Sequence, residues 1–385
     1  MEYPKQFETV RPYQDHEVNP AIERMMAYPQ FKAMLKYLYE GADMEELVGI
    51  FRSLDTVYEF QHFFSEYTVH KIIEKTSGGL TTRGSENITP GNPYLFVGNH
   101  RDIVLDAAIM QWILNYHGHN TSQITFGSNL MKEQFLLDLG KLNKMFTFFR
   151  GGSRVEQYRN ALNNSAYINF VIKEYRESIW IAHRNGRTKN GDDRTQTGLI
   201  KMLAAGSKNI YRDLADLNIV PVTISYETEP CDIQKIKELY VSRRKQYVKA
   251  PDEDYHSILA GITGEKGRIG YAFGTPLNAF ITGLEKENLH PNEIIERITR
   301  EIDRQIHRDF ALWPGNYAAY DILHQTAEYD DLYTGKEKLA FEETMAKKTG
   351  TLEGFDPVEL RTLYLEMYAN PVNNRRALDQ DGETV

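Results

Sequence analysis

Short runs of apolar and β-branched residues recur through the middle of the chain, and each has the length of a β-strand. The runs are Leu80–Arg83, Tyr94–Val97, Gln123–Phe126, Phe146–Phe149, Ile179–Ala182, Val220–Tyr226 and Arg268–Phe273. Helical patterns separate several of them. Strands that alternate with helices favour an α/β fold with a mixed, partly parallel sheet flanked by helices. In such folds ligands bind at the carboxyl ends of the strands.

Both ends of the chain have helical patterns instead. Near the N-terminus, Asn19-Pro20 has the residues of a helix start, and Asp43 those of a second N-cap. Apolar residues from Leu47 to Tyr58 recur at spacings of three and four, which predicts one helix face. An isoleucine stripe from 295 to 306 predicts a C-terminal helix, and the polar tail from Asn373 is expected to fray. The predicted organisation is an N-terminal helical region (1–78), an α/β domain (79–284), and a C-terminal helical region with a frayed tail (285–385).

Composition and charge narrow the class of protein. Hydrophobic residues make up 41% of the chain and charged residues 26%, which is typical of a soluble globular protein. The formal net charge of −9 argues against nucleic acid as a partner of the whole surface. No segment approaches the ~20 consecutive apolar residues of a membrane-spanning helix. Residues 1–19 also lack the apolar stretch of a secretory signal, so the sequence predicts a cytoplasmic protein.

The segment Asn99–Asp106, NHRDIVLD, is the first candidate for chemistry. It directly follows a predicted strand, and Gly98 permits a sharp exit from that strand. A neutral imidazole at His100 would take a proton from a hydroxyl, and a nearby carboxylate would orient the ring. An alternative interpretation of these residues is a polar turn in which Asp102 caps the next helix.

Two later segments combine cations with glycines. Arg150 stands beside two glycines, where its guanidinium and nearby backbone amides would suit a phosphate. The alternative there is an amphipathic helix followed by a strand. After the predicted strand Ile179–Ala182, the loop Asn185–Lys189 offers backbone amides and the cations Arg187 and Lys189 to an anion. A solvated surface loop is the alternative for that segment.

In their order along the chain, these segments resemble the conserved blocks of the glycerol-3-phosphate and 1-acylglycerol-3-phosphate acyltransferase family. His100 matches the catalytic histidine of that family, and Asp106 most nearly its aspartate. The segment Phe148–Arg150 is similar to the block whose arginine grips the phosphate of the acceptor. Asn185–Lys189 resembles the family's loop of an acidic residue, glycine, any residue, arginine and serine. Val220–Glu227 is close to the fourth block, and the resemblance covers about residues 80 to 280.

The resemblance implies an O-acyltransferase. It would move a fatty acyl group from acyl-CoA or acyl carrier protein to a hydroxyl of glycerol 3-phosphate or lysophosphatidate, with His100 as general base. Its partners would be that thioester donor and a lipid acceptor, with peripheral contact at the inner face of the cell membrane. Neither a cofactor nor a metal is expected. The residues that would bind the acceptor and its phosphate are Arg150, Gly186, Arg187, Thr188 and Lys189, and those of the acyl-site wall are Pro221 and Val222.

Three departures from the family pattern matter. Five residues separate His100 from Asp106, where the family has four. Six positions on a straight helix rotate by ~600°, so the pair requires His100 to lie in the turn before the helix. Asp102 is the fallback carboxylate. The acidic residue of the third block is replaced by Asn185 or Arg184, and the second block has Arg150-Gly151 where many relatives have two arginines.

These departures leave two other functions open. An O-acyltransferase that acts on a non-glycerol lipid, such as an amino-acid lipid, would explain the changed third block. A lipid-binding protein without catalysis would explain the lengthened spacing between His100 and Asp106. Of the three functions, O-acylation of glycerol 3-phosphate or lysophosphatidate is the one that the sequence favours.

Overall fold

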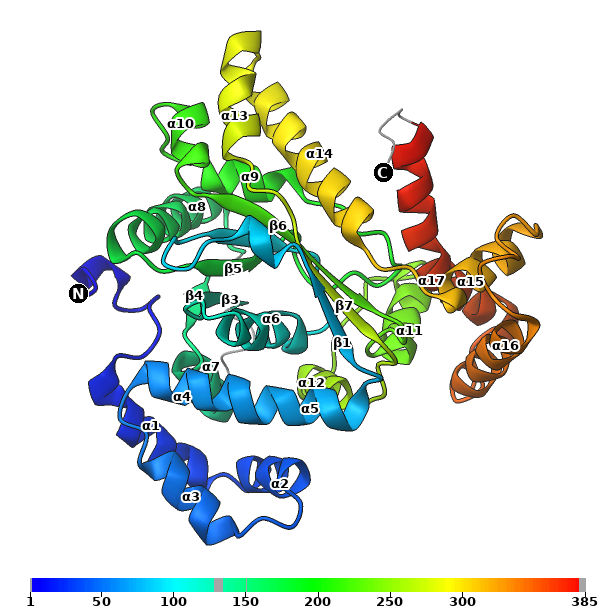
Figure 1. Cartoon of the computed structure of the whole chain (residues 1–385), viewed down its shortest axis with the longest axis horizontal. Helices are drawn as coiled ribbons and strands as arrows, with labels where there is room; N and C mark the ends of the chain where they lie inside the picture. The colour runs from blue at the N-terminus through cyan, green and yellow to red at the C-terminus, as the bar shows by residue number, and fades with distance from the viewer. Residues whose placement is uncertain (1, 128–133, 150, 381–385) are drawn as a thin grey trace.

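A seven-stranded sheet forms the centre of the molecule (Figure 1). The computed structural model describes residues 2–127, 134–149 and 151–380. The strands are β1 (Leu80–Arg83), β2 (Leu95–Gly98), β3 (Gln123–Gly127), β4 (Met145–Phe148), β5 (Ile179–Ala182), β6 (Ile219–Tyr226) and β7 (Ile269–Phe273). Each lies within one residue of a predicted strand at either end, so the apolar runs located the whole sheet.

The strand order is β1-β7-β6-β2-β5-β3-β4, and the β6–β7 pair is antiparallel whereas the other neighbours are parallel. This mixed sheet confirms the predicted fold class. Central strand β2 is paired with β5 on one side and β6 on the other. Because these three strands are parallel, their carboxyl ends meet at one edge of the sheet, where the loop that contains His100 begins.

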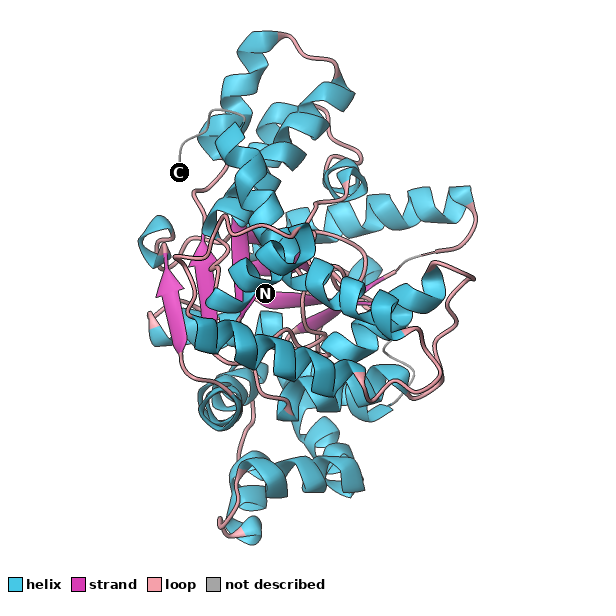
Figure 2. Ribbon diagram, turned by 90° about the vertical axis from the view of Figure 1, so that its right-hand side faces the viewer, coloured by secondary structure: helices cyan, strands magenta, loops and turns pink. Residues whose placement is uncertain are grey.

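Helices cover both faces of the sheet (Figure 2). The N-terminal helices and α6, α7 and α12 pack on one face, whereas α8, α9, α10, α13 and α14 pack on the other. On the first face the bounds are α1 (Asp15–Ala27), α2 (Pro29–Leu38), α3 (Met44–Arg52), α4 (Val57–Phe63), the π-helical turn η2 (Phe64–Val69), α5 (His70–Thr76), α6 (Leu105–Tyr116), α7 (Gln134–Leu142) and α12 (Glu253–Thr263). On the second they are α8 (Arg154–Asn169), α9 (Thr197–Leu203), α10 (Ile210–Ala215), α13 (Asn278–Leu284) and α14 (Pro291–Asp309).

Side-chain alternation along the strands divides the core into two layers. Leu95 and Val97 of β2 face the α8–α9 side, whereas Phe96 faces α6. All three are buried, which is typical of a strand with helices on both faces. A third apolar cluster lies outside the sheet, where α11 (Asp232–Ser242) packs with α15 (Pro314–His324), α16 (Gly335–Thr349) and α17 (Pro357–Gln380).

Three predictions about the helical ends are wrong in detail. Asn19-Pro20 does not begin a helix, because a capping box between Gln14 and Glu17 starts α1 earlier and leaves Pro20 inside it. The single helix face predicted from 47 to 58 is divided, since a capping box at Thr56 starts α4 separately from α3. At the other end, α17 continues to Gln380 where fraying was predicted, and Asn374 within it is buried. No helix among the described residues is long and apolar enough to cross a membrane.

Candidate active site

His100 and Asp106 form a hydrogen-bonded pair at the carboxyl edge of the sheet. His100 Nδ1 lies 2.9 Å from Asp106 Oδ2. The histidine side chain is 15% exposed, whereas the carboxylate is 1% exposed. The imidazole also packs edge-on against Trp180 of β5, with 5.8 Å between the ring centroids. The buried carboxylate of Asp106 therefore holds the Nδ1 edge of a partly accessible imidazole.

The extra residue between His100 and Asp106 is absorbed before the helix. Residues 99–104 form a turn after β2, and α6 begins only at Leu105, so Asp106 lies in the first helical turn. Its carboxylate folds back over this turn and accepts the backbone N–H groups of Arg101 at 2.6 Å and Asp102 at 2.9 Å. The location of His100 in the turn before the helix is the arrangement that the sequence required for the pair.

Tyr226 completes the surroundings of the carboxylate. Its hydroxyl, at the carboxyl end of β6, donates to Asp106 Oδ1 at 3.0 Å. Burial raises the pKa of Tyr226 well above its ordinary value, and the charge of Asp106 acts in the same direction, so the phenol keeps its proton as a donor. Asp106 thus accepts from a side chain on each of two strand ends and from two backbone groups. The sequence interpretation assigned Tyr226 no such part.

Asp102, the fallback carboxylate, has another structural role. Its Oδ1 accepts the backbone N–H groups of Val104 and Leu105, each at 2.9 Å, at the start of α6. Its Oδ2 is buried without a hydrogen-bond partner among the described residues. Helix α12 approaches so closely at Gly261 that an added Cβ would lie 2.2 Å from Asp102 Oδ2. The interpretation of Asp102 as a helix cap therefore fits the structure, and Asp106 is the partner of His100.

A cleft of about 310 Å³ opens beside His100. Apolar side chains of α6, β3 and β5 line one part of it, and the loop after β5 contributes Asn185, Gly186, Arg187 and Lys189. The structure therefore brings four residues of the third block to the same cleft as the histidine. Thr188 is the exception: it is buried, and its hydroxyl donates to Asp193 at 2.6 Å, so it does not line the cleft.

The cations of this loop differ in their partners. Arg187 donates to the Ser257 hydroxyl at 3.3 Å, but its Nη1 is buried with no partner among the described residues. Lys189 forms an ion pair with Glu238. Gly186 has a φ of +74°, in the left-handed region that favours glycine, and no atom would lie within 4 Å of an added Cβ. Arg187 is accordingly the better placed of the two cations for an anionic ligand.

The remaining predicted site residues are Arg150, Pro221 and Val222. Arg150 is outside the described residues, whereas its neighbours Phe148 and Phe149 line a second pocket near β5. Pro221 and Val222 are buried in β6 beside β2 and line neither the His100 cleft nor the apolar cavity next to it. Their assignment to the acyl-site wall stays a prediction.

The apolar cavity that adjoins the cleft has walls that the sequence did not indicate. Its volume is about 60 Å³, and it lies among η2, α6, α7, α12 and strands β3 and β4. Four residues, Val104, Ile124, Phe126 and Met145, line both the cavity and the His100 cleft, so the two spaces are adjacent. Part of the wall comes from the N-terminal helical region, including Phe64 and Val69.

Beneath the cleft, a buried ionic network joins the loops after β2 and β5. Asp193 accepts from Asn99 at 3.0 Å and from Arg101 at 2.5 and 3.0 Å, and these two residues flank His100. Arg101 also pairs with Glu229 at 2.9 Å, and Lys235 pairs with Glu229 and donates to the carbonyl of Arg101. The charges of Arg101 and neighbouring groups lower the pKa of Asp193 to about 2, overcoming the opposite effect of burial. No sequence motif identified this network.

Comparison with known proteins gives one family match. Residues 79–225 match the protein-family model described as Acyltransferase, and no curated protein matches the chain. Among solved structures, the 1-acyl-sn-glycerophosphate (LPA) acyltransferase PlsC from Thermotoga maritima is similar with 12% identity and a TM-score of 0.35, over 74% of this chain and 93% of that one. The signal recognition particle 54 kDa protein from Aeropyrum pernix K1, in complex with GDP, is similar with 10% identity and a TM-score of 0.21, over 94% of each chain. At these scores neither structural likeness bears on fold or function.

Proposed function

Residues 79–225 match the protein-family model described as Acyltransferase, and on this basis we propose that the protein moves a fatty acyl group from a thioester to a hydroxyl of glycerol 3-phosphate or lysophosphatidate. The observation that supports the proposal most directly is the His100–Asp106 pair at the mouth of a cleft with an apolar extension. A lipid acceptor would bring the protein to the inner face of the cell membrane as a peripheral protein.

In the proposed reaction, His100 acts as the general base. Asp106 accepts the Nδ1–H hydrogen bond, which leaves the Nε2 lone pair to receive the proton of the acceptor hydroxyl. The hydroxyl oxygen forms a bond to the thioester carbonyl carbon, and the carbonyl electrons move to oxygen. When the tetrahedral intermediate collapses, the C–S bond breaks and the imidazolium returns its proton to the departing thiolate. The products are an ester and a free thiol, of CoA or of acyl carrier protein.

The two ends of the cleft would separate the acyl chain from the phosphate. The apolar cavity next to the cleft would receive the end of the acyl chain, because burial of each methylene contributes about 0.8 kcal/mol. Arg187, which lines the cleft, would bind the acceptor's phosphate, with Lys189 and the backbone at Gly186 nearby.

The test is acyl transfer by the purified protein and by His100→Ala. Long-chain acyl-CoA and acyl carrier protein would each be offered with glycerol 3-phosphate and with lysophosphatidate. We expect ester formation with at least one pair of substrates, and its loss by about 10²–10⁴-fold in the variant, which is the usual contribution of a general base. Transfer that is unchanged in His100→Ala would overturn the mechanism.

A second candidate function keeps the chemistry and changes the acceptor. Asn185 lines the cleft at a position where the resemblance places an acidic residue, and an amide there suits a neutral partner as well as a hydroxyl. An O-acyltransferase for a non-glycerol lipid, such as an amino-acid lipid, would therefore use the same His100 with a different headgroup. A panel of acceptors in the same assay separates the two. A lipid-binding protein without catalysis would instead retain its biological activity in His100→Ala.

A further inference from the structure

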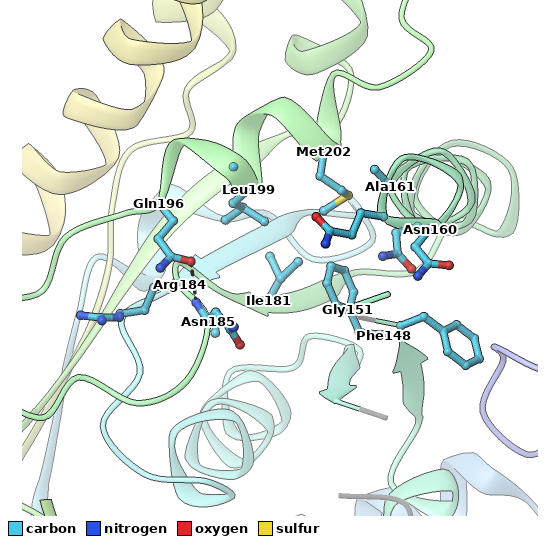
Figure 3. Close-up of a pocket in the computed structure, with 15 residues that line it drawn as sticks. Phe148, Gly151, Asn160, Ala161, Ile181, Arg184, Asn185, Gln196, Leu199 and Met202 are labelled. Atoms are coloured by element: carbon cyan, nitrogen blue, oxygen red, sulfur yellow. Dashed lines mark hydrogen bonds between the residues drawn. The ribbon is translucent and has the colours of Figure 1, made fainter. Parts of the chain in front are cut away.

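A second pocket, of about 250 Å³, opens at the carboxyl end of β5 on the opposite face of the sheet from α6 (Figure 3). Its apolar part comes from Ile181 of β5, Ala161 of α8, and Leu199 and Met202 of α9. Figure 3 shows these side chains around the pocket, with Asn160 projecting from α8 and Gln196 next to Asn185. The volume is slightly below the range of about 300–1,000 Å³ typical of small-molecule sites, so it suits a headgroup better than a whole lipid.

The pocket has an unusual polar wall. Gln157, Asn160, Ala161 and Asn164 of α8 line it, at the spacing of one helix face. The face that a helix turns toward a sheet is ordinarily apolar, but here three of the four residues are carboxamides. Asn185 and Gln196 add two more from the loop after β5.

Two of these carboxamides have no hydrogen-bond partner in the described part of the protein. Gln196 accepts the backbone N–H of Asn185 at 2.9 Å, and Gln157 donates to the carbonyl of Gly152 at 2.9 Å, whereas Asn160 and Asn164 make no such side-chain bonds. Asn164 is only 3% exposed. The amide of Asn164 is therefore left to hydrogen-bond whatever fills the pocket, so a polar ligand group would be well matched there.

The charge of the wall limits what that occupant can be. Among its described residues, Arg184 alone carries a charge, and its Nε is buried without a partner among them. Carboxamides donate and accept equally, so they suit hydroxyl and amide groups, whereas a single guanidinium suits one anionic group. The described part of the pocket therefore suits a headgroup with several hydroxyl or amide groups and at least one negative charge.

The pocket is continuous in its lining with the His100 cleft. Ala182 and Asn185 line both spaces, on either side of the end of β5. We propose that this second pocket binds the headgroup of the acyl acceptor, and that it gives the enzyme a preference for acceptors whose headgroup is larger and richer in hydrogen-bonding groups than that of glycerol 3-phosphate or lysophosphatidate. The identification of the occupant as the acceptor rests on the proposed acyl transfer. Two kinds of lipid have this chemistry, one with a polyol phosphate headgroup and one with an amino-acid headgroup.

Calorimetric titration of the full chain with short-chain soluble probes tests the assignment without requiring catalysis. The probes are hexanoyl lysophosphatidylinositol for the polyol phosphate, N-hexanoylserine for the amino-acid headgroup, and glycerol 3-phosphate for comparison. We expect one of the two larger probes to bind. The probe that binds shows whether the headgroup is a polyol phosphate or an amino acid. Failure of both to bind the wild-type protein at millimolar concentration would overturn the assignment.

Variants of the wall locate the binding. Asn160→Ala and Asn164→Ala each remove one carboxamide, and Asn163→Ala is the matched control, because Asn163 is exposed on the same helix and does not line the pocket. Gly198→Leu provides an independent variant, since no atom lies within 4 Å of an added Cβ there and the new side chain would occupy the pocket. Each variant should melt within about 2–4 °C of the wild type, the shift that 1 kcal/mol produces in a domain of 150–250 residues.

The assignment predicts that the larger probe binds about 10-fold more weakly to the three wall variants, from lost hydrogen bonds or lost space. The Kd of the larger probe for Asn163→Ala should differ from the wild-type value by less than twofold. The Kd of glycerol 3-phosphate should change by less than twofold in every variant. Equal affinities in Asn163→Ala and the wall variants would contradict it. If binding follows this pattern but no acceptor is acylated, the proposed function fails while the pocket assignment stands. If an acceptor is acylated but binding does not follow this pattern, the proposed function stands while the pocket assignment fails.

Discussion

The loops after β2 and β5 lie side by side at the carboxyl edge of the sheet, yet their polar groups are used differently. In the first loop, Asn99, Arg101 and Asp106 have hydrogen-bond partners within the protein, and Asp102 Oδ2 is the exception among its described side chains. In the second, Arg184 and Arg187 each have a buried N–H without a partner among the described residues. The first loop is thus fixed by the protein itself, as a catalytic group requires, whereas the second retains hydrogen-bonding capacity for a ligand.

The largest effect is expected from breaking the pair in the first loop. Asp106→Asn should lower kcat by about 10²–10⁴-fold, because an amide can donate to Nδ1 and favour the wrong imidazole tautomer. Steady-state kinetics with saturating donor and acceptor measure the change. Asp102→Asn is the control, since asparagine also caps helices well and Asp102 does not contact the imidazole. A kcat for Asp106→Asn within tenfold of the wild type would contradict the assigned role of the pair.

A loss of stability should follow from removing the guanidinium of Arg101, which joins the two loops. Arg101→Met leaves Asp193 and Glu229 buried without their guanidinium partner, which typically costs about 3–5 kcal/mol. Denaturant unfolding measures the free energy. The control is Arg268→Met, whose pair with Glu227 is half exposed and should contribute about 0–1 kcal/mol. Similar losses in the two variants would show that the buried network does not hold the loops together.

The second loop should affect binding more than chemistry. Arg187→Gln removes a charged donor from the cleft, so KM for a phosphate-bearing acceptor should rise by about 10–100-fold, the equivalent of about 1.5–3 kcal/mol, while kcat changes little. Arg194→Gln is the control, because Arg194 is exposed, pairs with Asp192 and does not line the cleft. A fall in kcat at constant KM would assign Arg187 to the chemical step instead.

The smallest expected effect is a loss of stability in mild acid. His183, at the start of the second loop, is fully buried, and burial lowers its pKa from 6.5 to about 3. Between these values the unfolded chain binds the proton and the folded chain does not. Stability therefore falls as pH decreases below 6.5, by about 1.4 kcal/mol per pH unit from this residue. Unfolding free energies of the wild type and His183→Gln at pH 7 and pH 5 should differ in slope, and parallel slopes would exclude the effect.

The sequence predicted the sheet well because each strand is an apolar run bounded by polar turns. It also predicted which residues of the first block meet, since His100 and Asp106 are joined by a short turn between consecutive elements. The sequence did not predict the additional hydrogen-bond partners of this loop. Tyr226 and Asp193 come from distant segments, and no local pattern shows that their side chains converge on Asp106 and Arg101.

Other features depend on packing that periodicity does not reveal. Phe64 and Val69 have ordinary helical spacing, but their contribution to the apolar cavity follows from how the N-terminal helices pack on α6. The carboxamides of α8 are visible in the sequence, yet Asn164 has significance only because its nearly buried side chain lines a pocket. Thr188 matched the family pattern in sequence, and its hydroxyl is used inside the protein by Asp193.

The most direct test of the central claim is a double-mutant cycle of His100→Ala and Asp106→Asn, measured as kcat for acyl transfer. If Asp106 acts by orienting the imidazole, its substitution should cost little once the imidazole is gone, and the double variant should be about as active as His100→Ala alone. If Asp106→Asn instead lowers kcat by the same factor with and without His100, the two residues act independently and the proposed pair is not the catalytic unit.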